Sequence, residues 1–348
     1  MSELSEIFSK NAAPAKQAAQ GDYVYPHLLC PTKAEKDKLN AVVNKLAKTP
    51  LGRELLDCAA EYGTEIRLDN MYGIWGAFAY TEKKLRLNKD ASEDRLVATL
   101  AHELRHSQQF QKGVEMDVLH DDPRSYLHSQ CVIEADANVA SCLVAWDLMK
   151  QGDNGVRDTL MQEDKGVFNK FFEVAQKEGT AKGSAPNAAF YEWFKDMRIR
   201  QAYENNYAKS VEYCKSHGSR KDSIFSRQVS VQDNIAKVCT VDGKAYVGKE
   251  SEEFFKRRDL NEINYETFWS IYRAMRDAGR MDWSDANKQM NDYGFYQREQ
   301  EFYSVKTPEK ARESVEERQQ RAANVIRGKK QQKTLPLSAL VAQNRSRG

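Results

Sequence analysis

The pentapeptide His102-Glu103-Leu104-Arg105-His106 constrains the fold of this chain more than any other segment. If it is α-helical, His102 and His106 lie about 40° apart around the helix axis and project from one face, with Glu103 on the flank of that face. Two neutral imidazoles one turn apart can bind the same divalent metal ion, whereas the carboxylate between them points poorly toward it. Glu103 is instead placed to accept a proton from a water on that metal. The fold therefore has to bring a third ligand to this helix face.

Start and stop signals predict that the pentapeptide lies on a helix of about residues 91–112. Asp90 is the predicted N-cap, and Glu93 reaches back to it as in a capping box. The dipeptide Asp122-Pro123 predicts the start of a second helix, which continues to Lys150. A short, acid-rich loop joins the two helices.

The second helix offers Glu134 as the third ligand, 28 residues after His106. Ala137 and Asn138 lie one turn beyond Glu134 on the same face, and the small Ala137 would let the two helices approach closely. Asp136 points away from that face, so we expect it to contact an imidazole N–H or solvent. The rival third ligands are Asp136, His128, His120 and Asp121.

Hydrophobic patterning divides the rest of the chain. Residues 32–63 show two amphipathic helical patterns, and short runs at 65–68, 74–80 and 84–88 predict a small antiparallel sheet. Later segments predict aromatic amphipathic helices and one hairpin around Asp242-Gly243. These helices are expected at 168–177, 188–214 and 265–278. The predicted class is α+β, divided into a flexible arm (1–22), a core (23–150), a mainly helical domain (151–304) and a basic, disordered tail (305–348).

Composition excludes several classes of protein. A chain of 348 residues with 41% hydrophobic and 30% charged residues is neither collagen-like nor wholly disordered. A mean hydropathy of −0.75, with no apolar run of about 18 residues, predicts no transmembrane helix. Six dispersed cysteines and an N-terminus without a standard secretory signal predict a cytoplasmic protein with reduced thiols, although signal-less export stays open.

Charge is unevenly distributed along the chain. Residues 305–348 contain eleven Lys or Arg against four Glu, whereas the whole chain has a net charge of only +2. A basic tail is weak support for nucleic-acid or membrane binding, because solvated tails of this kind are common. We therefore predict no membrane partner and no clear nucleic-acid partner, and the oligomeric state stays open.

These elements together resemble the core of the gluzincin-type zinc metallopeptidases. The resemblance rests on a hairpin, the helix with His102-Glu103-x-x-His106, and a following helix with Glu134-x-x-Ala137-Asn138. Residues 49–146 also resemble a bacterial and phage family of metallopeptidase-like domains, in which the metal helix reads much like Thr99 to Gln109 here. They are similar as well to the metallopeptidase domains of bacterial repressor-cleaving proteins. A zincin-like core and hydrolysis of proteins or peptides are the implied fold and function.

The resemblance also implies roles for single residues. His102, His106 and Glu134 would bind zinc, and Glu103 would be the general base. An edge strand near Gly76–Tyr80 would pair with the substrate backbone, although its alternation equally suits a structural strand. A Tyr or His would stabilise the oxyanion, and the candidates are His120, Tyr126, His128, Tyr191 and Tyr203. Two alternatives stay open, namely a catalytically inactive zincin-like scaffold and a highly selective effector or phage-type protease.

Overall fold

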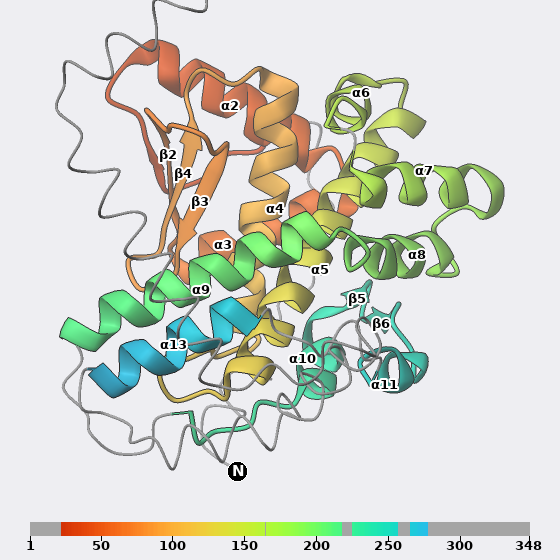
Figure 1. Cartoon of the computed structure of the whole chain (residues 1–348). Coiled ribbons are helices and arrows are strands. Elements are labelled where there is room, and N and C mark those ends of the chain that lie inside the picture. Colours follow the sequence, from red (N-terminus) through yellow and green to blue (C-terminus); the bar gives the residue numbers. More distant parts are fainter. Residues whose placement is uncertain (1–21, 164, 218–224, 257–264, 278–348) are drawn as a thin grey trace, which may run out of the picture. The chain divides into compact units, whose positions relative to one another are not determined.

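The computed structural model describes residues 22–163, 165–217, 225–256 and 265–277, which all belong to the unit Met1–Arg280. Within these ranges the chain is a mixed α+β protein with many helices and a small sheet, which confirms the predicted class (Figure 1). The predicted tail and nearly all of the predicted arm lie outside the described residues. No helix in the described ranges is long and apolar enough to cross a lipid bilayer.

Two helices precede the main part of the sheet. Helix α2 (Lys33–Ala47) begins with a capping box in which the Thr32 side chain accepts a hydrogen bond from the Glu35 N–H and the Glu35 carboxylate accepts one from the Thr32 N–H. Helix α3 (Pro50–Tyr62) begins at the Thr49 cap and ends at Gly63, which has the left-handed conformation that glycine adopts easily.

The sheet has the strand order β1 (Leu28–Leu29), β2 (Glu65–Asp69), β4 (Lys84–Asn88) and β3 (Gly76–Ala79). The predicted hairpin of β3 and β4 is confirmed, but the prediction of a wholly antiparallel sheet is wrong. β1 and β4 both run parallel to β2. The reason is that the chain leaves β2, passes beyond the position of β4 to form β3, and returns through a tight turn. This order leaves β3 at the edge.

The helix that carries the pentapeptide is α4 (Glu93–Gln111). The predicted cap at Asp90 is wrong: the N-cap is Ser92, whose hydroxyl accepts a hydrogen bond from the Arg95 N–H. Asp90 instead lies in the turn after β4, where its N–H donates to the Asn88 side chain. The next helix, α5 (Pro123–Lys150), starts at Asp122 as predicted, because the Asp122 carboxylate accepts hydrogen bonds from the first free N–H groups.

The later elements are α6 (Gly155–Met161), α7 (Gly166–Glu178), α8 (Ser184–Trp193), α9 (Met197–His217), α10 (Val231–Val238), β5 (Thr240–Val241), β6 (Lys244–Ala245), α11 (Glu250–Phe254) and α13 (Tyr265–Asp277). Helices α6 to α10 pack against α5, and α13 packs against α9. The prediction of a single helix over 188–214 is wrong, because two helices, α8 and α9, cover this range. The chain breaks between α8 and α9, where the Asp196 carboxylate accepts hydrogen bonds from the N–H groups of Arg198 and Ile199 and starts a new helix.

The hydrophobic core connects the two predicted domains. One cluster of buried residues includes Leu46 of α2, Leu100 of α4, Val144 of α5 and Phe190 of α8. Helix α5 packs against α4 on one side and against α7, α8, α9 and α10 elsewhere (Figure 1). A domain boundary near residue 150 stays a prediction. Helix α5 is shared, and residues on both sides of position 150 can therefore build one site.

Candidate metal centre

His102 and His106 project from one face of α4 toward α5. Their Nε2 atoms lie 3.1 Å apart, and their rings meet edge to face. Both side chains are half-buried, since 21% of the His102 side chain and 15% of the His106 side chain remain exposed. This geometry is the one that helical spacing predicts for residues four apart.

Glu134 of α5 completes a three-residue group. Its carboxylate oxygens lie 3.4 Å from Nε2 of His102 and 3.5 Å from Nε2 of His106. Ligand atoms at 2.0–2.1 Å from a tetrahedral ion are separated from one another by about 3.4 Å. Each histidine Nε2 therefore has one Glu134 oxygen, a different one in each case, at about the distance expected between two ligands of such an ion, and the donor set suits zinc. Among the described residues, this is the group of His, Cys, Asp and Glu that converges in this way.

The rival third ligands lie elsewhere. Asp136 pairs with the Arg105 guanidinium at 2.7 Å and is almost fully buried. His120 pairs with Asp117, and the buried Asp121 pairs with Arg227. His128 packs against the ring of Phe255. None of these four residues belongs to the converging group.

Glu134 and His106 each stabilise the charged form of the other, and His102 adds to the effect on Glu134. Burial opposes the ionised form of Glu134, but the imidazoles of His106 and His102 outweigh it and hold the pKa of this carboxyl well below its usual range. Burial likewise opposes the charged form of His106, yet Glu134 raises the pKa of this imidazole to about 9. The site thus accommodates positive charge next to Glu134, and a bound dication would take the place of that proton.

Glu103 lies between the edge strand β3 and the converging group of His102, His106 and Glu134, which is called the metal-binding group from here on for the role proposed below. Its side chain is almost buried, and this burial raises the pKa of the carboxyl although His102 and His106 act in the opposite direction. The Phe78 N–H of β3 donates a hydrogen bond to the carboxylate. A Cβ at Gly76 would lie 2.5 Å from Thr99 and 3.0 Å from Glu103, so only glycine lets β3 approach α4 this closely.

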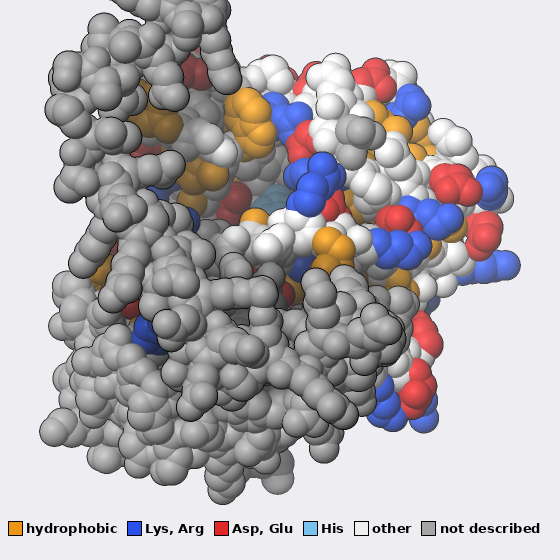
Figure 2. All heavy atoms as spheres, viewed as in Figure 1, with side chains coloured by type: hydrophobic (Ala, Val, Ile, Leu, Met, Phe, Trp, Pro, Cys, Tyr) orange, Lys and Arg blue, Asp and Glu red, His pale blue; other side chains and the backbone are white. Residues whose placement is uncertain are grey.

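Two cavities border the group. The first, called here the Arg95 cavity, measures about 400 Å³ and is lined by His102, Glu103, Glu134 and Tyr203 as well as Arg95. In Figure 2 a histidine surface is visible at the bottom of a hollow between charged and hydrophobic side chains.

The second, called here the Phe110 cavity, measures about 490 Å³ and is lined by His106, Glu134, Phe78, Tyr80 and Phe110. Glu134 contributes to both cavities, and the metal-binding group therefore faces open space on two sides.

The five oxyanion candidates lie in different environments. Tyr203 of α9 lines the Arg95 cavity and donates a hydrogen bond to the Glu134 carboxylate. Tyr126 lines the Phe110 cavity and stacks on Tyr207, whereas Tyr191 bonds to Glu250. His120 and His128 have the partners described above. Tyr203 thus touches a member of the metal-binding group. The sequence did not single out Tyr203, because it lies 69 positions after Glu134 and no local rule relates residues so far apart.

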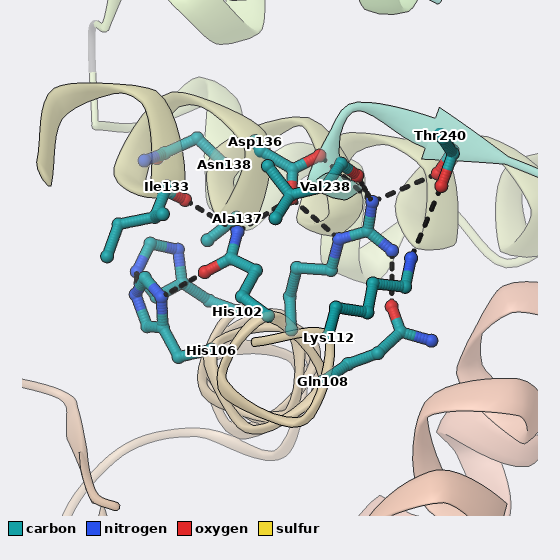
Figure 3. A network of polar contacts seen from close by, with 12 residues as sticks. His102, His106, Gln108, Lys112, Ile133, Asp136, Ala137, Asn138, Val238 and Thr240 are labelled. Atoms are coloured by element: carbon teal, nitrogen blue, oxygen red, sulfur yellow. Dashed lines mark hydrogen bonds and ion pairs between the residues drawn. The ribbon is translucent and has the colours of Figure 1, made fainter. Parts of the chain in front are cut away.

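A buried polar network lies behind His106 (Figure 3). Nδ1 of His106 lies 2.8 Å from Oε1 of Gln109, and Gln109 in turn contacts Asp136. The sequence analysis missed Gln109, whose one signal was its position three residues after His106. Asp136, expected at an imidazole or in solvent, reaches His106 only through this glutamine.

Comparisons with known proteins add one finding. A family model described as "Putative metallopeptidase family" matches residues 17–247, about two thirds of the chain. Comparisons with curated proteins and with solved structures gave no significant match. The matched region contains the converging group, Glu103 and Tyr203, and it continues through the β5–β6 hairpin.

Proposed function

From the premise that the chain belongs to this putative metallopeptidase family, we propose that it is a zinc-dependent peptidase of the gluzincin type with a zincin-like core. The observation that carries the proposal is the convergence of His102, His106 and Glu134 within 3.1–3.5 Å, beside the buried carboxyl of Glu103. Two imidazoles and one carboxylate are the protein ligands of many catalytic zinc sites, which keep a further position open. The Arg95 cavity, which is lined by His102, Glu103 and Glu134, offers room for water and substrate beside the group and so favours an open site over an occluded scaffold.

The chain's own residues suit the chemistry of peptide hydrolysis. When bound, zinc supplies Lewis acidity that activates water and polarises the scissile carbonyl. Glu103 accepts the proton of the attacking water and returns it to the leaving amine nitrogen. Its raised pKa favours the first transfer, because a carboxylate whose pKa is raised is a stronger base and accepts the water proton more readily. The Phe78 N–H keeps the carboxylate oriented.

The edge strand supports a peptide as substrate. Asn88 N–H donates to the Trp75 carbonyl at 2.8 Å, and the antiparallel register then directs the backbone groups of Gly76 and Phe78 away from β4. The Phe78 N–H already bonds to Glu103, so an extended peptide would add to this edge by main-chain hydrogen bonds to Gly76 and to the Phe78 carbonyl. Gly76 lines the Arg95 cavity and Phe78 lines the Phe110 cavity. A peptide along β3 would therefore pass the metal-binding group, with side chains entering both cavities.

The test is metal analysis of the purified protein combined with a cleavage assay on a peptide mixture. We expect about one zinc ion per chain. Chelation should abolish cleavage, and added zinc should restore it. If generic peptides are not cut, new protein N-termini in cells carrying the wild type should be compared with those in cells carrying Glu103→Gln, which detects a highly selective protease. Protein that binds no metal after supplementation would contradict the proposal.

Tyr203 is the residue that we assign to oxyanion stabilisation. Its hydroxyl bonds to Glu134 at the edge of the Arg95 cavity, where it can turn to a developing negative charge. Loss of one such donor typically costs about 10²- to 10³-fold in kcat, and we expect this loss for Tyr203→Phe with unchanged zinc content.

Tyr191→Phe is the matched control for this experiment, because Tyr191 bonds to Glu250 and lines neither cavity. Its kcat should stay close to the wild-type value. Equal rates for Tyr203→Phe and the wild type would remove Tyr203 from the mechanism.

A further inference from the structure

Gln109 occupies a buried position between the metal-binding group and α5. It is 2% exposed and lies one turn after His106 on α4. Its side chain has three neighbours: Nδ1 of His106 at 2.8 Å, the Ile133 carbonyl at 2.9 Å and the Asp136 carboxylate at 2.6 Å. The mechanism proposed above does not use this residue.

The neighbours of Gln109 determine which way its amide points. The Ile133 carbonyl and the Asp136 carboxylate can only accept hydrogen bonds, so the NH₂ group must face them and uses both of its protons there. A flipped amide would place its oxygen against two acceptors in a buried site, at the cost of two unsatisfied hydrogen-bonding groups. Oε1 of Gln109 therefore faces His106.

The amide orientation in turn determines the tautomer of His106. Because Oε1 of Gln109 accepts, Nδ1 of His106 must carry the proton that it donates. A neutral imidazole with its proton on Nδ1 has its lone pair on Nε2. Nε2 is the atom that lies 3.5 Å from Glu134 and 3.1 Å from His102, at the centre of the converging group.

Asp136 is the last residue in the series of contacts from His106 through Gln109, and it is itself held in place. One carboxylate oxygen accepts from Nε of Arg105 and from Gln109, and the other accepts from Nη2 of Arg105 and from the Tyr246 hydroxyl. Four donors thus surround a carboxylate that is 1% exposed. Arg105 also donates to the carbonyls of Val238 and Thr240 (Figure 3).

The hairpin region of residues 238–246 therefore helps to hold Arg105 and Asp136 in place behind the site. Tyr246 lies 110 positions after Asp136, on a segment that the sequence assigned to another domain. The region matched by the family model ends at residue 247, just after this tyrosine. The position of Gln109 thus depends on α4, α5 and the hairpin together.

We infer that Gln109 is a positioning residue: its amide, oriented by Ile133 and by the Asp136–Arg105–Tyr246 cluster, holds His106 in the tautomer and ring orientation that direct Nε2 to a metal ion. This inference rests on the proposed metal site. Partners of this kind behind a metal-binding histidine typically change metal affinity by about 10- to 100-fold.

The test compares the zinc dissociation constants of purified variants by competition with a chromophoric chelator, and the spectra of their cobalt complexes. Gln109→Met keeps the length of the side chain but loses both hydrogen-bonding functions. We expect its zinc affinity to fall about 10- to 100-fold and its cobalt spectrum to change. Gln109→Asn, whose amide is one methylene too short to reach His106, should show the same loss and serves if the first variant does not fold.

Gln111→Met is the matched control. Gln111 lies on the same helix, where its amide accepts a hydrogen bond from the Cys58 thiol and donates one to the Ser107 carbonyl, away from the Asp136–Arg105–Tyr246 cluster. It should leave zinc affinity within about threefold of the wild type, below the losses typical of a supporting partner. Equal affinity losses in Gln111→Met and Gln109→Met, or none in Gln109→Met, would overturn the inference. A wild type that binds no zinc would instead overturn the proposed function.

Discussion

Glu103→Gln is expected to abolish most peptide hydrolysis while the protein keeps its metal ion. Glutamine has nearly the same shape as glutamate and can still accept the Phe78 N–H through its carbonyl oxygen, but it cannot take a proton from water. General bases of this kind contribute about 10²- to 10⁴-fold to the rate, and we expect kcat/KM to fall by that factor. Initial rates on a cleaved substrate and zinc content measured on the same preparation would check this.

A glutamate elsewhere on the same helix provides the control. Glu93 lies exposed in the first turn of α4, away from the cavities, and Glu93→Gln changes the net charge by the same amount. It should leave kcat/KM within about twofold of the wild type, as surface substitutions usually do. If Glu103→Gln hydrolysed the substrate at the wild-type rate, Glu103 would not be the base.

His102→Ala is expected to remove the metal ion and the stability that the ion confers. The variant loses one of three converging donors, and its zinc affinity should fall by more than the roughly 100-fold seen for losses of supporting partners. At a free zinc concentration about 1,000 times Kd, an ion that binds only the folded state adds about 4 kcal/mol, or roughly 10 °C in melting temperature for a domain of this size. Thermal melts with and without zinc should therefore differ for the wild type and coincide for His102→Ala.

His128→Ala is the control that shows whether losing any histidine, rather than His102 in particular, removes the zinc-dependent shift in melting temperature. His128 packs against Phe255 and lies outside the converging group, so its replacement should keep the zinc-dependent shift in melting temperature. A shift in His102→Ala as large as that of the wild type would show that the ion binds elsewhere.

The arrangement of the two histidines could be predicted from the sequence because both lie on one helix. The four-residue spacing of His102 and His106 places both imidazoles on one face of any regular helix, whatever surrounds it. The start of α5 was equally legible, because Asp122 and Pro123 act through local hydrogen bonds and dihedral angles. For Glu134, local rules predicted a place on α5, but its approach to the histidines of α4 depends on how the two helices pack.

The wrong predictions about the fold share one cause: each depended on tertiary packing, which local sequence patterns do not specify. Ser92 and Asp90 both suit an N-cap, and the turn after β4 decides between them, since it draws Asp90 toward Asn88. The mixed sheet depends on which strand lies beside β2, and strand order is a property of the packed structure rather than of any strand's alternation. The break before α9 was visible only as one aspartate among many charged residues.

Residue pattern alone therefore determined that His102 and His106 share one face of α4 with Glu103 on its flank, because helix geometry relates residues within one turn. Packing decided the rest: that Glu134 rather than Asp136 faces the histidines, that Tyr203 meets Glu134, and that Gln109 is held by Asp136 and Tyr246. These contacts join residues up to 110 positions apart, and no local rule of backbone geometry relates residues so distant.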